Sequence, residues 1–381
     1  MSNDHAGIKD TNCWVEIDRE ALSWNVGQLR NLAGPDRLLM AVVKANAYGH
    51  GMKEVAPLAL EAGAEWLGVF SVDEGLELRG YGIDAPILVF GPTSRGRISE
   101  AFAASLRLTV ASLRAADEIA ELAPEGACVH LKVETGTNRQ GLVRDEIARA
   151  IDLLRKNGAI VEGIYTHFAD IEDTTDHRFA ESQLALFEEL VAATGDAKIP
   201  IPHAACSAAT ILFPTTYFQM VRVGIAMYGL WPSSETFVSA GSLGRNALDL
   251  RPVMTWKTRI AQIKSLSSGE FVGYGRTYRT TRPSQIALLP VGYSDGFDRR
   301  LGNGAYVLVN GARAPIRGRI CMNLTMIDVT DIPDAAPGDE VVLLGSQGEE
   351  NVSAEDLACQ TGTINYETVT RIAPGAPRIV V

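Results

Sequence analysis

Short apolar runs alternate with amphipathic stretches from about residue 38 to residue 229, and no long linker interrupts the alternation. The apolar runs have the length of buried strands, and stretches such as 145–154 and 179–191 carry apolar residues at helical spacing. This rhythm is typical of parallel α/β folds. We expect eight strands, at 38–43, 66–70, 86–90, 106–111, 128–133, 160–165, 200–204 and 220–224.

Eight successive βα units favour an α/β fold of the closed (β/α)8 TIM barrel type, although periodicity alone does not exclude an open doubly wound sheet. After residue 251 the pattern changes to short strands separated by turn residues, and only 354–359 has a helical pattern there. Asn310-Gly311 is typical of a tight hairpin. The strands expected in this part are 255–263, 286–289, 306–309, 326–329 and 341–344.

These patterns predict two domains. A barrel domain is expected at 14–245 and a mostly antiparallel C-terminal β domain at 246–381, with residues 1–13 as an expected addition to the second. A chain of 381 residues is long enough for either one large domain or two ordinary ones.

Composition and net charge indicate which classes of binding partner this chain suits. The chain has 46% hydrophobic and 21% charged residues, which is typical of soluble globular proteins. Its 46 acidic residues exceed its 35 Lys and Arg residues, for a net charge of −11. Binding to a phosphate backbone needs clustered cations, so we expect no nucleic-acid partner.

Cysteine usage and the N-terminus predict the compartment. The five cysteines are scattered and form no C-x-x-C pair, as expected of reduced thiols in a cytoplasmic protein. The start, residues 1–5, lacks the basic and apolar segments of an export signal. No apolar run approaches the roughly 20 residues that span a bilayer, so we expect a cytoplasmic protein without a membrane partner.

Three apparent motifs fail on inspection. The segment 292–296 matches G-x-S-x-G, but no helical pattern and no histidine follow it, so we interpret it as a turn in the β domain. The glycine spacing of 136–141 continues with Leu-Val instead of the Lys-Ser/Thr of a phosphate loop. The acidic loop 167–177 lacks the helical register of a zinc pair, so we expect no metal.

Catalytic groups of a parallel barrel project from the carboxyl ends of its strands, where the βα loops form one rim. Lys44 directly follows an apolar strand, and desolvation there lowers the pKa of a lysine. This makes Lys44 a candidate Schiff-base lysine, although a lysine extending from a strand end into solvent is an equal alternative. The other polar strand ends contain Arg139, His167, Ser207 and Arg222.

The last two strand ends predict an anion site. Ser207 and the backbone amides of Gly224 and Ile225 are placed to hold a phosphate at the barrel end. A lysine together with a phosphate site suggests pyridoxal 5'-phosphate (PLP).

The segment 41–51, AVVKANAYGHG, resembles the cofactor-binding signature of bacterial alanine racemases, which combine a PLP barrel with a β domain. The resemblance covers nearly the whole chain and continues, in order, in the segments 132–141, 166–168, 203–209, 221–225, 228–229, 273–278, 318–322 and 365–367.

The resemblance implies a role for each matching residue. Lys44 would hold PLP covalently, and Tyr274 would be the second acid/base on the opposite face. Arg222 would meet the ring nitrogen, Arg139 the phenolate side of the cofactor and the substrate, and Met322 the substrate carboxylate. His167 would stack near the ring or support Arg222. The implied phosphate ligands are Tyr48, Ser207, Gly224, Ile225 and Tyr366.

The family also implies a homodimer with shared active sites, because its tyrosine reaches the cofactor of the other subunit. Inversion at a carbon requires proton removal on one face and return on the other, so two bases are the minimum. Each residue also has an ordinary alternative: Arg222 as partner of an acidic loop residue, His167 as a core histidine, Tyr274 and Met322 as packing residues.

Departures from the family pattern bear on the substrate more than on the cofactor. They are Glu134, Thr137, Asn138, Gln140, Cys206 and Asn323. Lys132 matches a lysine that is carbamylated in many relatives. The leading hypothesis is a PLP-dependent racemase of alanine, a small amino-acid substrate, with D-alanine biosynthesis as the expected role and D-amino-acid catabolism as the open alternative. The alternatives are a racemase of serine or another amino acid, a PLP-binding barrel without racemase activity, and a barrel-type PLP decarboxylase.

Overall fold

The computed structural model describes residues 11–245 and 248–381, which divide into two compact units. The barrel unit contains residues 20–47 and 55–251, and the β unit contains residues 11–19, 48–54 and 252–381. The expected domain boundary at 245/246 adjoins residues 246–247. Those residues, and the N-terminal segment used to predict the compartment, lie outside the described part of the chain.

Eight parallel strands form the barrel sheet, in the order β8-β7-β6-β5-β4-β3-β2-β9. Backbone hydrogen bonds from Gln219 to Pro202 (3.1 Å) and from Arg222 to Ala205 (3.0 Å) link its two end strands. All eight strands predicted from the sequence are confirmed. They are β2 Leu38–Val42, β3 Trp66–Val69, β4 Ile87–Val89, β5 Leu106–Val110, β6 Cys128–Lys132, β7 Ile160–Tyr165, β8 Ile201–His203 and β9 Met220–Val223.

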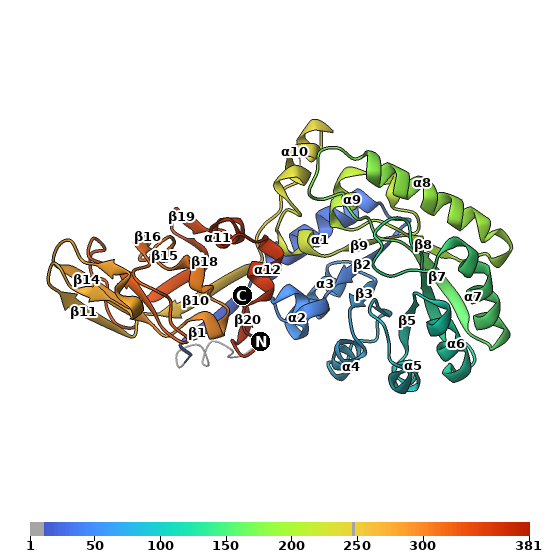
Figure 1. Cartoon of the computed structure of the whole chain (residues 1–381), viewed down its shortest axis with the longest axis horizontal. Coiled ribbons are helices and arrows are strands. Elements are labelled where there is room, and N and C mark those ends of the chain that lie inside the picture. Colours follow the sequence, from blue (N-terminus) through green and yellow to red (C-terminus); the bar gives the residue numbers. More distant parts are fainter. Residues whose placement is uncertain (1–10, 246–247) are drawn as a thin grey trace. The chain divides into compact units, whose positions relative to one another are not determined.

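Helices surround these strands (Figure 1). Helix α7 buries four apolar residues along one stripe while its charged residues face outward, which is the pattern that predicted it. The helices are α1 Arg19–Ala33, α2 Lys44–Tyr48, α3 Met52–Glu61, α4 Val72–Gly80, α5 Ile98–Ala103, α6 Leu113–Leu122, α7 Arg144–Lys156, α8 Arg178–Ala193, α9 Ser207–Leu212 and α10 Ser234–Ser242. The helices predicted at 145–154 and 179–191 are therefore confirmed as α7 and α8.

The β unit contains mostly antiparallel strands in three sheets. One sheet has the order β16-β15-β18-β10-β1-β20 with β19 beside β18, the second is β11-β14-β17, and the third is β12-β13. The strands are β1 Cys13–Ile17, β10 Met254–Arg259, β11 Gln262–Leu266, β12 Phe271–Val272, β13 Tyr278–Arg279, β14 Ser284–Leu289, β15 Tyr306–Val309, β16 Ala312–Pro315, β17 Thr325–Asp328, β18 Glu340–Gln347, β19 Glu350–Val352 and β20 Arg378–Val380. The fold class predicted from the sequence is confirmed.

Two details of this unit correct the prediction. The single strand expected at 255–263 is two strands in different sheets, because the chain changes partner between Ile260 and Ala261. Ile260 donates its N–H to Asp339 beside β18, and Ala261 donates to Leu288 of β14. The expectation of one helix was also wrong. After α11 (Ala354–Thr361), a second helix, α12 (Asn365–Thr370), follows.

The predicted hairpin at Asn310-Gly311 is confirmed. The two residues have φ values of 49° and 77° and connect paired residues Val309 and Ala312. Positive φ at both central residues is what a type I′ turn requires. The segment 292–296 is likewise a turn, in which Asp295 accepts a hydrogen bond from the N–H of Gly292 at 2.9 Å.

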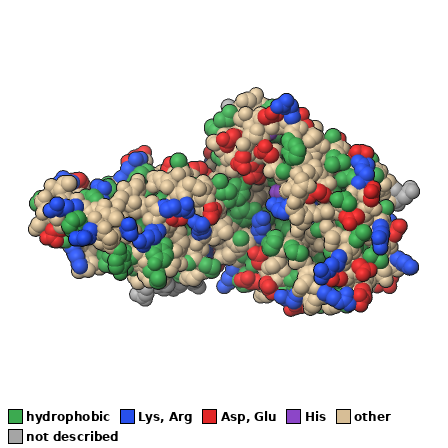
Figure 2. All heavy atoms as spheres, in the orientation of Figure 1, with side chains coloured by type: hydrophobic (Ala, Val, Ile, Leu, Met, Phe, Trp, Pro, Cys, Tyr) green, Lys and Arg blue, Asp and Glu red, His purple; other side chains and the backbone are tan. Residues whose placement is uncertain are grey.

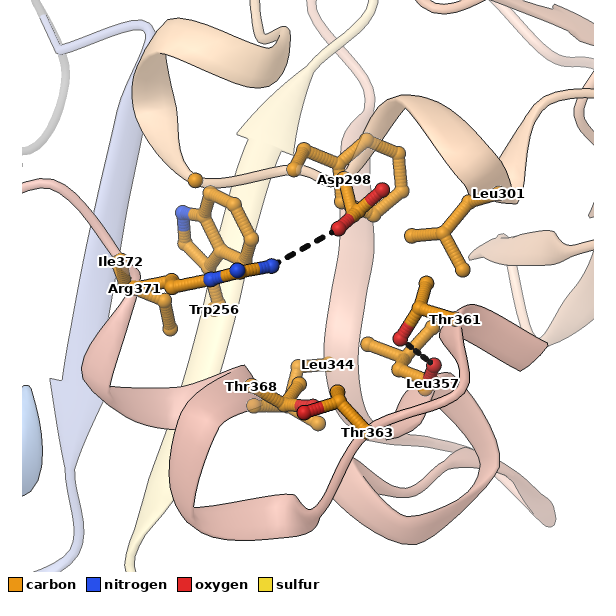
Figure 3. A pocket seen from close by; sticks show the side chains of 12 residues that line it. Trp256, Asp298, Leu301, Leu344, Leu357, Thr361, Thr363, Thr368, Arg371 and Ile372 are labelled. Carbon is orange, nitrogen blue, oxygen red and sulfur yellow. Dashed lines mark hydrogen bonds and ion pairs between the residues drawn. The ribbon is translucent and has the colours of Figure 1, made fainter. Parts of the chain in front are cut away.

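Helix α12 lies beside a small apolar pocket of the β unit, shown in Figure 3. The guanidinium of Arg371, directly after α12, points to Asp298 and pairs with it at 3.0 Å. Thr361 of α11 donates its hydroxyl to the carbonyl of Leu357 at 2.7 Å. The Arg371–Asp298 pair connects the end of α12 to the turn at 299–301, and the Thr361 bond lies within α11.

The surface mixes both signs of charge. Figure 2 shows acidic and basic side chains interspersed over the visible face, in contrast to the clustered cations of a nucleic-acid interface. Within the described residues, no helix combines the length and apolar character needed to cross a membrane.

Candidate active site

Lys44 lies two residues after the end of the barrel strand β2 and is half-buried. Burial lowers the pKa of its ammonium, and the charge of Arg139 lowers it further, while Glu74 and Glu172 oppose the shift. A lysine with a lowered pKa holds more of its amine in the unprotonated form, which is the form that attacks a carbonyl or removes a proton. The lowered pKa agrees with the role predicted for Lys44, which stays a prediction.

The chain turns left-handed immediately after this lysine. Ala45, Asn46, Ala47 and Tyr48 have φ values between 53° and 54°. This conformation costs about 1–2 kcal/mol for each residue other than glycine, so surrounding contacts have to hold it. Two of them are a hydrogen bond from the N–H of Ala47 to the carbonyl of Val43 (2.8 Å) and one from the N–H of Ala45 to Glu74 (2.6 Å).

Arg222 on β9 is buried, and three hydrogen bonds fix its guanidinium. It donates to Nδ1 of His203 at 2.9 Å, to the carbonyl of Thr166 at 2.9 Å and to the carbonyl of Ala204 at 3.0 Å. These partners are uncharged, so the alternative in which Arg222 pairs with an acidic loop residue is wrong. Burial lowers its pKa to about 10, which leaves it protonated at neutral pH.

A hydrogen-bonded chain crosses the barrel from Arg222. Nε2 of His203 lies 2.9 Å from Nδ1 of His130, and Nε2 of His130 lies 3.4 Å from Glu162. Burial lowers the pKa of both histidines, so each is neutral with one N–H. Because an arginine only donates, Nδ1 of His203 accepts from Arg222. Nε2 of His203 then donates to Nδ1 of His130, and Nε2 of His130 donates to Glu162. Arg107 pairs with that carboxylate at 3.3 Å.

Reasoning from the sequence missed His130 and Glu162, the part of this hydrogen-bonded series that lies farthest from Arg222. His130 lies inside the strand β6 and Glu162 inside β7, where period-2 alternation predicts only which face a residue occupies. The one available signal is polar residues at buried positions of barrel strands, since His130 is fully buried.

His167 follows β7 and faces the cations of the rim. Burial lowers its pKa well below the usual value, with further lowering by Arg222, Lys132, Arg139 and Lys44 in that order. These interactions show that the structure brings the predicted rim residues together in the barrel unit. His167 is therefore a neutral imidazole, able to stack or accept a hydrogen bond but not to add a positive charge.

Lys132 at the end of β6 is a buried cation beside Arg222. Burial lowers its pKa to about 7, with a further contribution from Arg222. Its Nζ donates to the carbonyl of Val133 at 3.1 Å and lies 5.4 Å from the ring centre of Tyr165. Carbamylation requires an unprotonated amine, and a lowered pKa makes that form more abundant.

Stability should therefore depend on pH through Lys132. Its folded pKa of about 7 lies below the ordinary 10.5, so the unfolded chain binds more protons between these values and stability rises with pH there. We expect wild type to gain about 2 kcal/mol of stability relative to Lys132→Met between pH 7 and pH 9. Urea unfolding of the cofactor-free proteins in buffer freed of carbon dioxide measures it. A difference that stays constant with pH would contradict the buried ammonium.

Ser207, predicted to bind a phosphate, contacts the segment after β9. Oγ of Ser207 accepts hydrogen bonds from the N–H of Gly224 at 2.9 Å and from the N–H of Ala226 at 3.4 Å. Ile225, the other predicted phosphate ligand of this segment, lies between Gly224 and Ala226 in the chain, and its phosphate role stays a prediction. The neighbouring Cys206 is buried, and burial raises the pKa of its thiol to about 12, so it is not a nucleophile.

The other predicted residues belong to the β unit. Tyr274 opens a short turn at 274–276, and its side chain is 69% exposed, so it is not a packing residue within this unit. Met322 is 56% exposed. The rings of Tyr48 and Tyr366 lie together, with centroids 6.1 Å apart.

Family models cover almost the whole chain. Residues 17–232 match the alanine racemase N-terminal domain, and residues 253–380 match the alanine racemase C-terminal domain. The chain belongs to the alanine racemase family. This confirms the resemblance predicted from the sequence, and the alanine racemases are isomerases.

Curated relatives and solved structures agree with this assignment. The alanine racemase of Leptospira interrogans is 39% identical over 386 residues, covering 100% of this chain and 99% of the relative. That of Desulfosudis oleivorans is 43% identical over 387 residues, covering 98% and 97%. The structure of alanine racemase from Bacillus anthracis with bound L-Ala-P has a TM-score of 0.90 and 38% identity, covering 97% of this chain and 95% of that one.

Proposed function

We propose that this protein interconverts L-alanine and D-alanine with PLP as its cofactor, in the cytoplasm, as a homodimer that supplies D-alanine biosynthesis. The observation that carries the proposal is the cationic rim around Lys44, in a chain that matches alanine racemases over its whole length. We further propose that 14–245 and 246–381 act as its two domains.

The charges of the rim fit an anionic cofactor. Lys44, Lys132, Arg139 and Arg222 all lower the pKa of His167. Lys132 and Arg222 are buried, Lys44 is half-buried and Arg139 is exposed. Like charges repel at low dielectric, and a phosphate with a phenolate would neutralise them. Lys44 would hold PLP covalently, Arg222 would meet its ring nitrogen, and Arg139 would lie at the phenolate side. Tyr48, Ser207, Gly224, Ile225 and Tyr366 would bind the phosphate.

When bound, PLP supplies an electron sink that stabilises the substrate after loss of its α-proton. Lys44 would remove or return that proton on one face and Tyr274 on the other, as inversion requires. Arg139 and Met322 would orient the substrate carboxylate, and the neutral His167 would lie near the ring.

At the ring nitrogen, Arg222 would limit the electron withdrawal that PLP supplies. Its guanidinium is only a donor and keeps its proton with a pKa of about 10. A ring nitrogen that accepts from it has to be unprotonated, which makes the ring a weaker electron sink. The neutral His203 and His130 behind it supply no further proton. We infer that this arrangement favours reprotonation of the substrate over side reactions.

Two residues that differ from the family pattern, Thr137 and Cys206, make hydrogen bonds within the protein. These bonds support alanine, rather than serine, as the substrate. The hydroxyl of Thr137 donates to the carbonyl of His167 at 2.6 Å, and the thiol of Cys206 lies 3.8 Å from Glu172. Groups engaged in this way offer a substrate hydroxyl no dedicated partner. The test is chiral analysis after incubation with L-alanine or L-serine, with and without PLP. Carbon dioxide release from lysine or ornithine, without inversion of alanine, would instead identify a decarboxylase.

A shared site makes two inactive variants complementary. If Tyr274 of one subunit serves Lys44 of the other, a dimer of one Lys44→Ala chain and one Tyr274→Phe chain contains one complete site. Random pairing makes about half the dimers mixed, with one of two sites repaired, so activity should recover to about a quarter of wild type. Co-expression followed by racemisation assays measures it. Confirmed hetero-dimers that stay inactive would show that both bases come from one chain.

A further inference from the structure

Glu74 lies at the barrel rim beside the left-handed turn that follows Lys44. It is the third residue of α4, and its carboxylate joins two strand ends. Oε1 accepts the N–H of Ala45 at 2.6 Å, and Oε2 accepts the N–H groups of Phe70 at 2.7 Å and Ser71 at 3.2 Å. Ala45 follows the strand β2 by three residues, and Phe70 directly follows β3.

Only an ionised carboxylate matches this set of partners. All three are N–H donors, and they approach both oxygens of the same group. An ionised carboxylate is an acceptor at both oxygens, whereas a side-chain amide has one oxygen and one donating NH2. A glutamine here would leave either Ala45 or the pair Phe70 and Ser71 facing a donor.

The bond to Ala45 is the one with a consequence for the chemistry. Ala45 is the first of four consecutive residues with positive φ, and it is covalently next to Lys44. The capping box of α4 pairs Glu74 with Ser71 in both directions: Ser71 Oγ accepts the backbone N–H of Glu74, and the Glu74 carboxylate accepts the N–H of Ser71. The rigid end of α4 is thereby connected to the backbone that carries the lysine.

We propose that Glu74 is a positioning residue for Lys44, holding the left-handed turn so that the amine points to its reaction partner. The inference rests on the proposed function, since it assigns the amine its role there. It also adds a charge effect: Glu74 raises the pKa of Lys44 and so partly offsets burial and Arg139. Loss of this carboxylate should lower that pKa and misplace the amine.

The test compares four variants. Glu74→Gln retains a residue that suits a capping box but removes the charge and one acceptor. Glu74→Asp retains the charge and shortens the reach. Ser71→Ala weakens the helix cap without changing the acceptor of Ala45. Glu77→Gln is a matched control, because Glu77 lies on the same helix and accepts from Tyr81.

Three quantities separate positioning from helix capping: kcat in both directions, the pH midpoint of PLP uptake by the cofactor-free protein, and the temperature of unfolding. We expect Glu74→Gln to lose about 10-fold to 100-fold in kcat and to show a lower pH midpoint. Glu74→Asp should lose kcat with the wild-type midpoint. Ser71→Ala should lower only the unfolding temperature, and Glu77→Gln should match wild type.

Two results would overturn the proposal in distinguishable ways. A folded Glu74→Gln protein with wild-type kcat and midpoint, or equal losses in Ser71→Ala, would leave Glu74 with a structural role only, while the racemase function stands. Wild-type protein that neither takes up PLP nor inverts alanine would overturn the proposed function itself, and the role of Glu74 with it.

Discussion

Replacing Lys44 with alanine is expected to abolish racemisation in both directions, with a loss of more than about 10⁴-fold. Under the proposed function, the variant would lose the covalent attachment of PLP and one of the two bases at once. The half-buried amine with its lowered pKa is the group that supplies both. Turnover of L-alanine and of D-alanine is measured by chiral chromatography, and PLP retention by the visible absorbance of the lysine-bound cofactor.

The matched control is Lys53→Ala, because Lys53 is an exposed lysine. It should keep wild-type turnover and cofactor. Full turnover by Lys44→Ala without an added amine would refute the assignment, whereas rescue by a small primary amine would agree with it.

Replacing Tyr274 with phenylalanine is expected to keep PLP bound and to reduce racemisation by about 10²-fold to 10⁴-fold, the range for loss of a general acid or base. Exchange of the α-proton should survive for one enantiomer, whose proton faces Lys44, and fall for the other. The exposed ring of Tyr274 packs against little within its own unit, so the substitution should change the stability by no more than about 0.5 kcal/mol. Proton exchange of each enantiomer in heavy water, followed by NMR, measures the asymmetry.

Tyr306→Phe provides the control. Tyr306 belongs to the same unit, and its ring lies under the guanidinium of Arg313. Its activity and exchange rates should equal those of wild type. Mild and equal effects of Tyr274→Phe on both enantiomers would reduce Tyr274 to a surface tyrosine.

The barrel could be predicted from the sequence because its strands and helices alternate in a regular pattern. Buried parallel strands are continuous apolar runs, and each of the eight is separated from the next by a helical pattern. The β unit was less predictable. The run at 255–263 has the composition of a single strand, and only the partners Asp339 and Leu288, distant in sequence, divide it between two sheets. Helix α12 contains aromatic and β-branched residues, whose low helix propensity is overridden by its packing beside α11.

In the candidate site, too, some features could be predicted from the sequence and others could not. Rim residues such as Lys44 and Arg222 were predictable because the carboxyl ends of barrel strands are the established place for chemistry. The left-handed turn was not, since neither Ala45 nor Ala47 favours positive φ and the contact to Glu74 spans 29 residues. The partners of His130 were also hidden, because hydrogen bonds across a barrel depend on the register of its strands.

The most direct test of the central claim is incubation of the PLP-loaded protein with L-alanine in heavy water, followed by chiral separation and mass analysis of each enantiomer. The account predicts equal amounts of L-alanine and D-alanine at equilibrium, both carrying deuterium at the α-carbon, because each inversion removes the α-proton and returns one from a residue in exchange with solvent. L-Alanine recovered without D-alanine, from protein that has PLP bound, would contradict it.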